Sequence, residues 1–192
     1  MLDLVLKRHS IAFRVSVKSI VSILIVVVAV ALPQIFHIAG GVSAGAAYLP
    51  MYAPVLLAGC LLGWQWGLGV GILSPLVSFG FSSIALDSAM PALSRLPYMV
   101  LELSVFGLVS GLFSKKIQTN SLFAFPAVIL SQICGRTVYV IYNLIAGRQF
   151  PELLTAIQTG LIGLYLQAAV IPFAVILLSI VLKREREEQG NE

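Results

Sequence analysis

The chain has 192 residues, of which 59% are hydrophobic and only 10% are charged, and its formal net charge is +4. Soluble domains carry about 25% charged residues, so this composition excludes an ordinary water-soluble fold. Because a membrane-spanning helix needs about 20 mostly apolar residues, the length allows about six spans joined by short loops. We therefore expect an all-α membrane protein, a six-transmembrane-helix bundle.

The first apolar stretch, residues 11–32, follows the basic residues Lys7 and Arg8 and precedes Pro33. It is longer than the hydrophobic region of a secretory signal, which has about 7 to 15 residues, and no clear small-residue cleavage site follows it. We interpret it as a retained first helix that ends at Pro33. The next segment, 34–47, is rich in glycine and alanine and is predicted to be a loop.

Five more helices are predicted along the rest of the chain. Trp64 and Trp66 lie in a tight turn, residues 63–67, between the second and third helices, which is typical of an interfacial anchor. The bundle is expected to fill residues 1–182 as a single transmembrane domain, followed by a charged cytoplasmic tail at 183–192. The predicted ranges of these five helices are 49–63, 65–84, 91–113, 122–146 and 153–182.

The basic residues orient the predicted spans, because cytoplasmic loops carry an excess of lysine and arginine. Arg148 alone falls in an outer loop, and Arg95 and Arg136 lie within helices. This distribution predicts that both termini are cytoplasmic. It also argues against nucleic-acid binding, because the basic residues form no stripe interleaved with aromatic residues. With the N-terminus inside, the cytoplasmic basic residues are Lys7, Arg8, Arg14, Lys18, Lys115, Lys116, Lys183, Arg184 and Arg186.

Glycines recur at every fourth position in two parts of the chain. Small residues at this spacing let helix backbones approach closely inside a membrane. Packing within the chain is the main interpretation, and docking to a partner membrane subunit is the alternative. These glycines are Gly59, Gly63, Gly67 and Gly71 in one series and Gly107 and Gly111 in the other.

Three ionisable side chains fall inside predicted spans, where each costs about 2.5 to 3.5 kcal/mol and is expected to face the bundle interior. Arg95, Tyr98 and Glu102 share one face of their helix by their spacing. A second helix repeats the pattern with Gln132, Arg136, Tyr139 and Asn143. Each of the two helices is thus predicted to carry one polar, aromatic stripe.

The two stripes are expected to line one cavity that opens to the outer side, with segment 34–47 as a lid, because small-molecule pockets combine aromatic walls with a few polar groups. Two arginines indicate an anionic group on the ligand, since guanidinium binds carboxylate or phosphate through two parallel hydrogen bonds. The alternative is that Glu102 pairs with Arg136 only to hold two helices together.

No catalytic motif is found, and the chain is predicted not to be an enzyme. HExxH, GxSxG and nucleotide-binding glycine loops are absent, and His9 and His37 lie outside the predicted spans. Cys60 and Cys134 lack metal-binding or redox spacing and are interpreted as packing residues, so no metal is expected. Without a nucleotide site, uphill transport requires an ATPase partner or an ion gradient.

Two stretches, YLPMYAPVLLAGCLLGWQWGLGVGILSPLVS at 48–78 and MPALSRLPYMVLELSVFGLVSGLF at 90–113, resemble the S component of an energy-coupling factor (ECF) vitamin transporter. The Gly135, Arg136 pair is also similar to that family. The resemblance covers the chain from about 45 to 182. It implies a multi-pass protein of a prokaryotic plasma membrane that holds a vitamin or precursor in an outer pocket, partly closed by the segment after the first helix.

The resemblance also implies partners and pocket roles. The partners are a transmembrane coupling subunit and two cytoplasmic ATPases, which use ATP, so this chain itself needs no cofactor. Pocket roles are implied near Tyr52, Arg95, Glu102 and Arg136. Tyr52 stands where relatives often have histidine, which leaves pantothenate, folate, cobalamin or a benzimidazole-type precursor open. In place of the family's AxxxA docking motif, the first helix has a small-residue face of Ala12, Ser16, Ser19 and Ser22.

Two other classes of function remain open. One is a self-sufficient secondary transporter that uses Glu102 as its proton site. The other is a membrane scaffold in which the polar stripes serve only helix packing. The candidate substrate-binding residues are Tyr52, Arg95, Tyr98, Glu102, Arg136, Tyr139 and Asn143.

Overall fold

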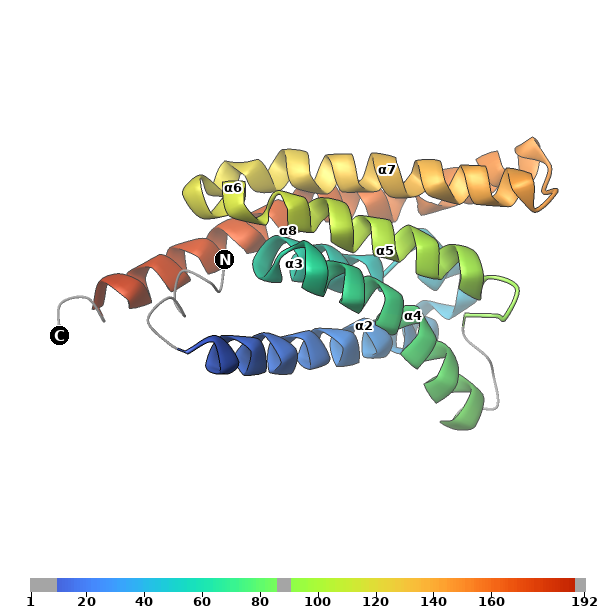
Figure 1. Cartoon of the computed structure of the whole chain (residues 1–192). Helices are drawn as coiled ribbons and strands as arrows, with labels where there is room; N and C mark the ends of the chain where they lie inside the picture. The colour runs from blue at the N-terminus through green and yellow to red at the C-terminus, as the bar shows by residue number, and fades with distance from the viewer. Residues whose placement is uncertain (1–9, 86–90, 189–192) are drawn as a thin grey trace.

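The structure, a computed structural model, describes residues 10–85 and 91–188 (Figure 1). Across these residues the chain is almost entirely helical and contains no strand. The helices are α2 (Ile11–Tyr48), α3 (Tyr52–Leu62), α4 (Trp64–Ala85), α5 (Leu96–Leu112), α6 (Ser114–Thr119), the 3₁₀ turn η2 (Ser121–Phe123), α7 (Ala124–Ile145) and α8 (Phe150–Glu188).

Helix α2 is longer than the sequence predicted. The Ser10 side chain caps its first turn by accepting a hydrogen bond from the Phe13 amide at 3.3 Å. Pro33 lies inside the helix, and the helical path is interrupted only at Gly41, where φ is 69° and ψ is −170°. The prediction of a loop at 34–47 is therefore wrong. Helix is favoured in apolar surroundings because it satisfies backbone groups internally, and one missing proline donor does not outweigh this.

Five helices in the described part of the chain are long and apolar enough to cross a membrane. These five helices are consistent with a multi-pass membrane protein. The sixth crossing, which would be α5, stays a prediction. Helix α5 has only 17 residues and spans about 26 Å, slightly less than the hydrocarbon core of about 30 Å. The five candidate spans are Ile11–Ile38, Gly45–Leu62, Trp64–Ile84, Ser121–Ile145 and Phe150–Leu182.

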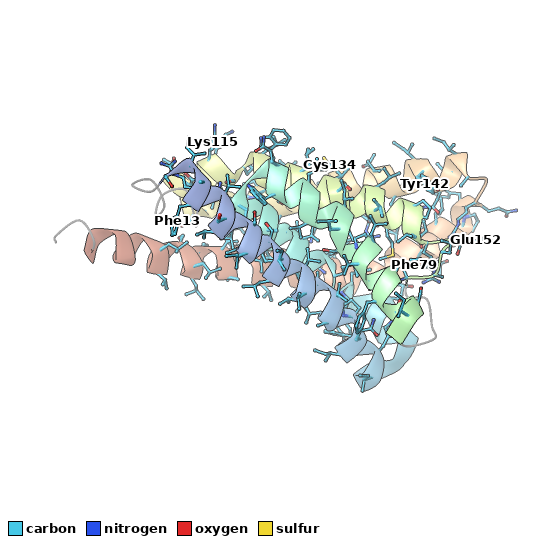
Figure 2. The ribbon with its side chains drawn as sticks, turned by 60° about the horizontal axis from the view of Figure 1, so that its bottom comes forward. Phe13, Phe79, Lys115, Cys134, Tyr142 and Glu152 are labelled. Carbon is cyan, nitrogen blue, oxygen red and sulfur yellow. The ribbon has the colours of Figure 1, made fainter. Side chains whose placement is uncertain are left out.

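The helices run between two ends of one elongated bundle. The start of α2, the short helix α6 and the end of α8 lie at one end, while the start of α5 and the α7–α8 turn lie at the other (Figure 1). Lys115 marks the first end, and Tyr142 and Glu152 lie toward the second (Figure 2). The basic residues Arg95 and Arg148 also belong to the second end by their place in the chain. Which end faces the cytoplasm stays a prediction.

Helices α3, α4 and α5 form the tightly packed centre. The side chains of Val55, Leu56 and Phe106 all lack exposed surface. A Cβ atom added at Gly67 would meet the backbone of Gly107, and one added at Gly107 would meet that of Gly67. The prediction that the spaced glycines serve packing within the chain is thus confirmed for this pair, whereas Gly63 ends α3 with φ of 99° and a Cβ atom there would meet only Ser114 Oγ at 3.8 Å. Cys60 and Cys134 are both free thiols, the first buried and the second partly buried.

Much of the outer surface is apolar. On α2, Ile20, Ile23 and Leu24 are each more than half exposed, and α8 presents Phe173 and Leu177 in the same way. Soluble monomers rarely expose contiguous apolar patches of this kind, and a bilayer would cover them. Helix α8 continues to Glu188, so the predicted tail begins with helical backbone.

Candidate functional site

Three polar side chains from three helices meet inside the bundle. Tyr52 of α3 donates a hydrogen bond from its hydroxyl to Glu102 Oε2 at 2.6 Å. Arg136 Nη1 of α7 lies 3.0 Å from Glu102 Oε1, and Glu102 itself, on α5, has no exposed surface. We call Tyr52, Glu102 and Arg136 the polar cluster. It carries one formal negative and one formal positive charge in a buried setting.

The local sequence explains why these helices come close enough to meet. Phe106 lies one turn after Glu102 on the same face of α5, and Gly135 of α7 packs against its ring, where a Cβ atom would clash. Because residue 135 has no side chain, α7 approaches α5 closely and the next residue, Arg136, reaches Glu102. The Tyr52 ring meets the Phe106 ring edge to face with centroids 5.0 Å apart, which fixes the phenol.

The guanidinium of Arg136 also sits between two aromatic rings. Its central carbon lies 5.6 Å from the centroid of Tyr52 and 5.6 Å from that of Tyr139. A cation within about 6 Å of a ring face is attracted by the ring's negative potential, more strongly when both are desolvated. The rings therefore hold the charge in place and leave the edges of the guanidinium for hydrogen bonding.

One edge of that guanidinium has no hydrogen-bond partner. Arg136 Nε and Nη2 are both buried, and among the described residues neither donates to an acceptor. Arg136 Nη1 and Glu102 Oε1 are close enough for an ion pair but are not aligned as a hydrogen bond. Glu102 Oε1 therefore has no hydrogen-bond donor among the described residues. Buried donors are nearly always paired, which makes this edge a candidate for an anionic ligand.

An open groove of about 530 Å³ runs beside the cluster between α7 and α8. Arg136 and Gln132 contribute to its wall, and Gln132 Nε2 donates to the Leu164 carbonyl at 2.9 Å, which joins the two helices there. The volume falls in the range of small-molecule sites, about 300 to 1,000 Å³. The lining residues are Ile129, Gln132, Ile133, Arg136, Thr137, Val140, Ile141, Ile157, Leu161, Leu164 and Tyr165.

A second aromatic group lies toward the end of the bundle that carries the α7–α8 turn. Tyr98 meets Tyr139 edge to face at 5.2 Å and lies 6.3 Å from the Tyr142 ring. The Arg148 guanidinium lies over the Tyr98 ring at 5.6 Å. Tyr139 thus belongs to both groups, so that an unbroken aromatic path links Arg148 to Arg136.

The structure brings four of the predicted site residues, Tyr52, Glu102, Arg136 and Tyr139, into direct contact, and places Tyr98 one ring away. Asn143 is buried, but its amide donates to the Tyr139 carbonyl of its own helix at 2.8 Å.

Arg95 lies apart from the polar cluster. It is the exposed residue that precedes α5, seven positions before Glu102, or about 10 Å along the helix axis. The predicted arginine pair is thus not formed in the described part of the chain.

Two features of the site escaped the sequence analysis. Gln167 of α8 donates to the carbonyls of Tyr48 at 3.2 Å and Leu49 at 3.0 Å, and so holds the α2–α3 junction against α8. Leu49 adopts a left-handed backbone conformation with φ of 49°. The sequence signal that could have revealed this contact was Gln167 itself, a polar side-chain amide within an apolar stretch of the chain. Arg148 was the other omission, because it was treated as a loop residue.

Within residues 10–85 and 91–188, no group of three or more histidine, cysteine, aspartate or glutamate side chains lies close enough to hold a metal ion. Comparisons with models of known protein families, with curated proteins and with solved structures find no match. The polar cluster, its unpaired guanidinium edge and the neighbouring groove are therefore the observations from which a function can be proposed.

Proposed function

We propose that this chain is the substrate-binding S component of an ECF-type importer, which captures a small vitamin or vitamin precursor at the outer face for ATP-driven uptake. The single observation that carries the proposal is the convergence of Tyr52, Glu102 and Arg136 from three helices, with one edge of the Arg136 guanidinium buried and unpaired. The family in this proposal is inferred from the sequence resemblance of residues 48–78 and 90–113 to S components.

The energetics favour a binding role over packing alone. Buried ion pairs often stabilise a fold no better than apolar residues of the same volume, because desolvation offsets their attraction. A buried donor without a partner adds about 1 to 3 kcal/mol of destabilisation. Arg136 pays both penalties, and an intramembrane ionisable residue of this kind is by default a functional candidate. A ligand anion at the unpaired edge would remove the second penalty.

The proposed partners are a transmembrane coupling subunit and two cytoplasmic ATPases. Helix α2 offers a surface for the coupling subunit, because Ala12 and Ser16 are exposed near its start and small side chains permit close helix contact. Ser19 is partly buried and Ser22 is buried, so only the first part of the predicted small-residue face is free.

Transport assays with the purified chain alone test the proposal against a secondary transporter. Glu102 is a buried carboxyl group, as a proton site requires, so this rival has an observation in its favour. We expect chain-only proteoliposomes to bind substrate without accumulating it under a pH gradient, and the chain purified from its native host to bring ATPase subunits with it. Gradient-driven accumulation by the chain alone would instead establish the secondary transporter.

A scaffold role makes a different prediction. If the polar cluster served only packing, the native chain would carry no small molecule, and the Arg95→Ala variant and any Arg136→Ala protein that still folds would function as the parent does. Because Arg95 is exposed, whereas the Arg136 side chain is only 14% exposed and contacts Glu102, the receptor proposal expects the Arg136→Ala variant alone to lose ligand.

A further inference from the structure

The chain between α5 and α7, residues 112–123, forms a turn at one end of the bundle, which we call the α5–α7 turn (Figure 1). Its short helix α6 exposes two adjacent lysines, Lys115 and Lys116. Among the side chains that the structure describes, neither lysine forms an ion pair with a carboxylate. The sequence from 103 to 145 contains no aspartate or glutamate, so no side chain of this stretch neutralises the two charges.

Helix α6 holds its lysines on a fixed platform. Ser114 and Ile117, on the opposite face of this helix, are both buried. The Lys116 ammonium lies 5.6 Å from the centroid of the Phe113 ring and 5.9 Å from that of the Phe123 ring, within the range of a cation–π attraction. The two rings therefore restrict where this positive charge lies, which lowers the entropic cost of binding an anion there.

The same turn also exposes large apolar side chains. Leu112 is 58% exposed, Leu122 is 60% exposed and Phe123 is 39% exposed. Phe123 connects this apolar surface to the charge, because its ring contacts Lys116. Apolar side chains suited to hydrocarbon beside exposed lysines are typical of a helix end at the level of the lipid headgroups, where lysine stems lie in the apolar layer and the ammonium reaches the polar one.

Trp64, at the start of α4, gives independent support for that level. It is 47% exposed and belongs to the same end of the bundle. A Cβ atom added at Gly111, near the end of α5, would meet the Trp64 backbone, and one added at Gly63 would lie 3.8 Å from Ser114 Oγ of α6. Because tryptophan is enriched at membrane–water interfaces, the start of α4 and the α5–α7 turn both have the character of an interfacial region.

We propose that the α5–α7 turn binds an anionic phospholipid, whose phosphate pairs with Lys115 and Lys116 while its acyl chains lie against the exposed apolar side chains of the turn. Charge complementarity selects this occupant, because a lysine ammonium binds phosphate as a point charge and no described carboxylate competes for it. The inference goes beyond the proposed function and does not depend on it. It agrees with the predicted orientation, since anionic lipids concentrate negative potential at the cytoplasmic leaflet.

Quenching of tryptophan fluorescence by brominated lipids tests the inference, because both tryptophans of the chain, Trp64 and Trp66, lie at the start of α4. The full chain is reconstituted in phosphatidylcholine with increasing fractions of brominated phosphatidylglycerol, or of brominated phosphatidylcholine as the reference. We expect phosphatidylglycerol to bind more tightly, by about fivefold for each lysine that contacts its phosphate. Raising the salt concentration to about 1 M should remove most of this preference, because exposed charges are then screened.

Matched variants locate the binding. Changing both lysines to glutamine, Lys115→Gln with Lys116→Gln, removes two charges at exposed positions and is expected to abolish the preference for phosphatidylglycerol. Changing both to arginine keeps the charges and is expected to keep the preference. The control Arg95→Gln removes one exposed charge at the opposite end of the bundle and is expected to leave quenching as in the parent chain. Thermal melts check that every variant is folded.

Equal quenching by the two brominated lipids in the parent chain would overturn the lipid site and leave the lysines to an acidic segment of a protein partner. A preference that the glutamine double variant retains would overturn it as well. So would an equal loss in Arg95→Gln, because the attraction would then come from the net charge of the chain. A preference that only the glutamine double variant loses would establish the site, whatever substrate the polar cluster holds.

Discussion

Glu102 has no exposed surface, yet each of its carboxylate oxygens faces a partner from another helix. Such an arrangement is sensitive to the loss of one member, because the remaining charge stays buried without compensation. Removing both charges together avoids that penalty. The three side chains Tyr52, Glu102 and Arg136 should therefore behave as one unit in stability measurements.

A double-mutant cycle on Glu102→Gln and Arg136→Gln tests this coupling. We predict that each single change lowers the free energy of unfolding by about 3 to 5 kcal/mol. The double change should lower it by less than the sum of the two single effects, because no unpaired charge remains. Thermal or denaturant unfolding in detergent gives the values. The control Arg148→Gln removes only an exposed contact with Tyr98, worth about 0.5 to 1 kcal/mol. Additive effects in the cycle would show that Glu102 and Arg136 act separately.

The sequence could predict which residues share a helix face but not how deep each one lies. Helical spacing placed Arg95 and Glu102 on one stripe, and the structure puts the first at the exposed start of α5 and the second in its buried centre. The convergence of Glu102 with Arg136 was predictable, because two costly charges in neighbouring spans lower their free energy by pairing. The unpaired guanidinium edge was not, since it depends on the side-chain conformation of Arg136.

At the scale of an element, the extent of helix α2 could not be predicted from single residues. Pro33 was expected to end the helix, but it removes only one donor and the apolar surroundings favour continued helix. The interruption falls at Gly41, whose backbone angles lie in a region that only glycine adopts readily. The central helices were easier, because their glycine spacing indicated close backbone contact within the chain, and the structure shows that the helices in contact are α4 and α5.

Replacing Gly67 with alanine tests that backbone contact. Its Cβ atom would collide with the Gly107 backbone, so we predict that Gly67→Ala lowers the unfolding free energy by about 1 to 3 kcal/mol. Gly69→Ala, two residues along the same helix with open space around it, should be neutral or slightly stabilising. Parallel thermal melts of the two variants give the comparison, and equal melting temperatures would contradict close packing of α4 on α5.

The topology of the whole molecule depends on whether the short helix α5 crosses the bilayer. With α5 as a crossing, the start of α5 and the short helix α6 lie on opposite sides of the membrane, as they lie at opposite ends of the bundle (Figure 1). Composition predicted the membrane class and charge predicted the orientation. Neither property fixes the span count, because α5 at 17 residues is near the lower limit for a spanning helix.

Cysteine labelling tests the topology. In a Cys134→Ser background, with Cys60 retained because it is fully buried, Lys115→Cys and Gln149→Cys place exposed thiols at α6 and at the α7–α8 turn. We predict that a membrane-impermeant maleimide labels the Gln149→Cys variant in intact cells and the Lys115→Cys variant only after permeabilisation, as the positive-inside rule requires. Labelling of both variants from the same side would exclude six crossings with this orientation.

Native mass spectrometry of the chain purified from its own host tests most directly whether the polar cluster holds a ligand. We predict a bound small molecule in the parent chain and its loss in the Glu102→Gln, Arg136→Gln double variant, with thermal melts confirming that this variant remains folded. The identity of the released molecule would also define the substrate. A parent chain without any bound molecule, or a folded double variant that retains it to the same extent, would contradict a ligand site built on Glu102 and Arg136.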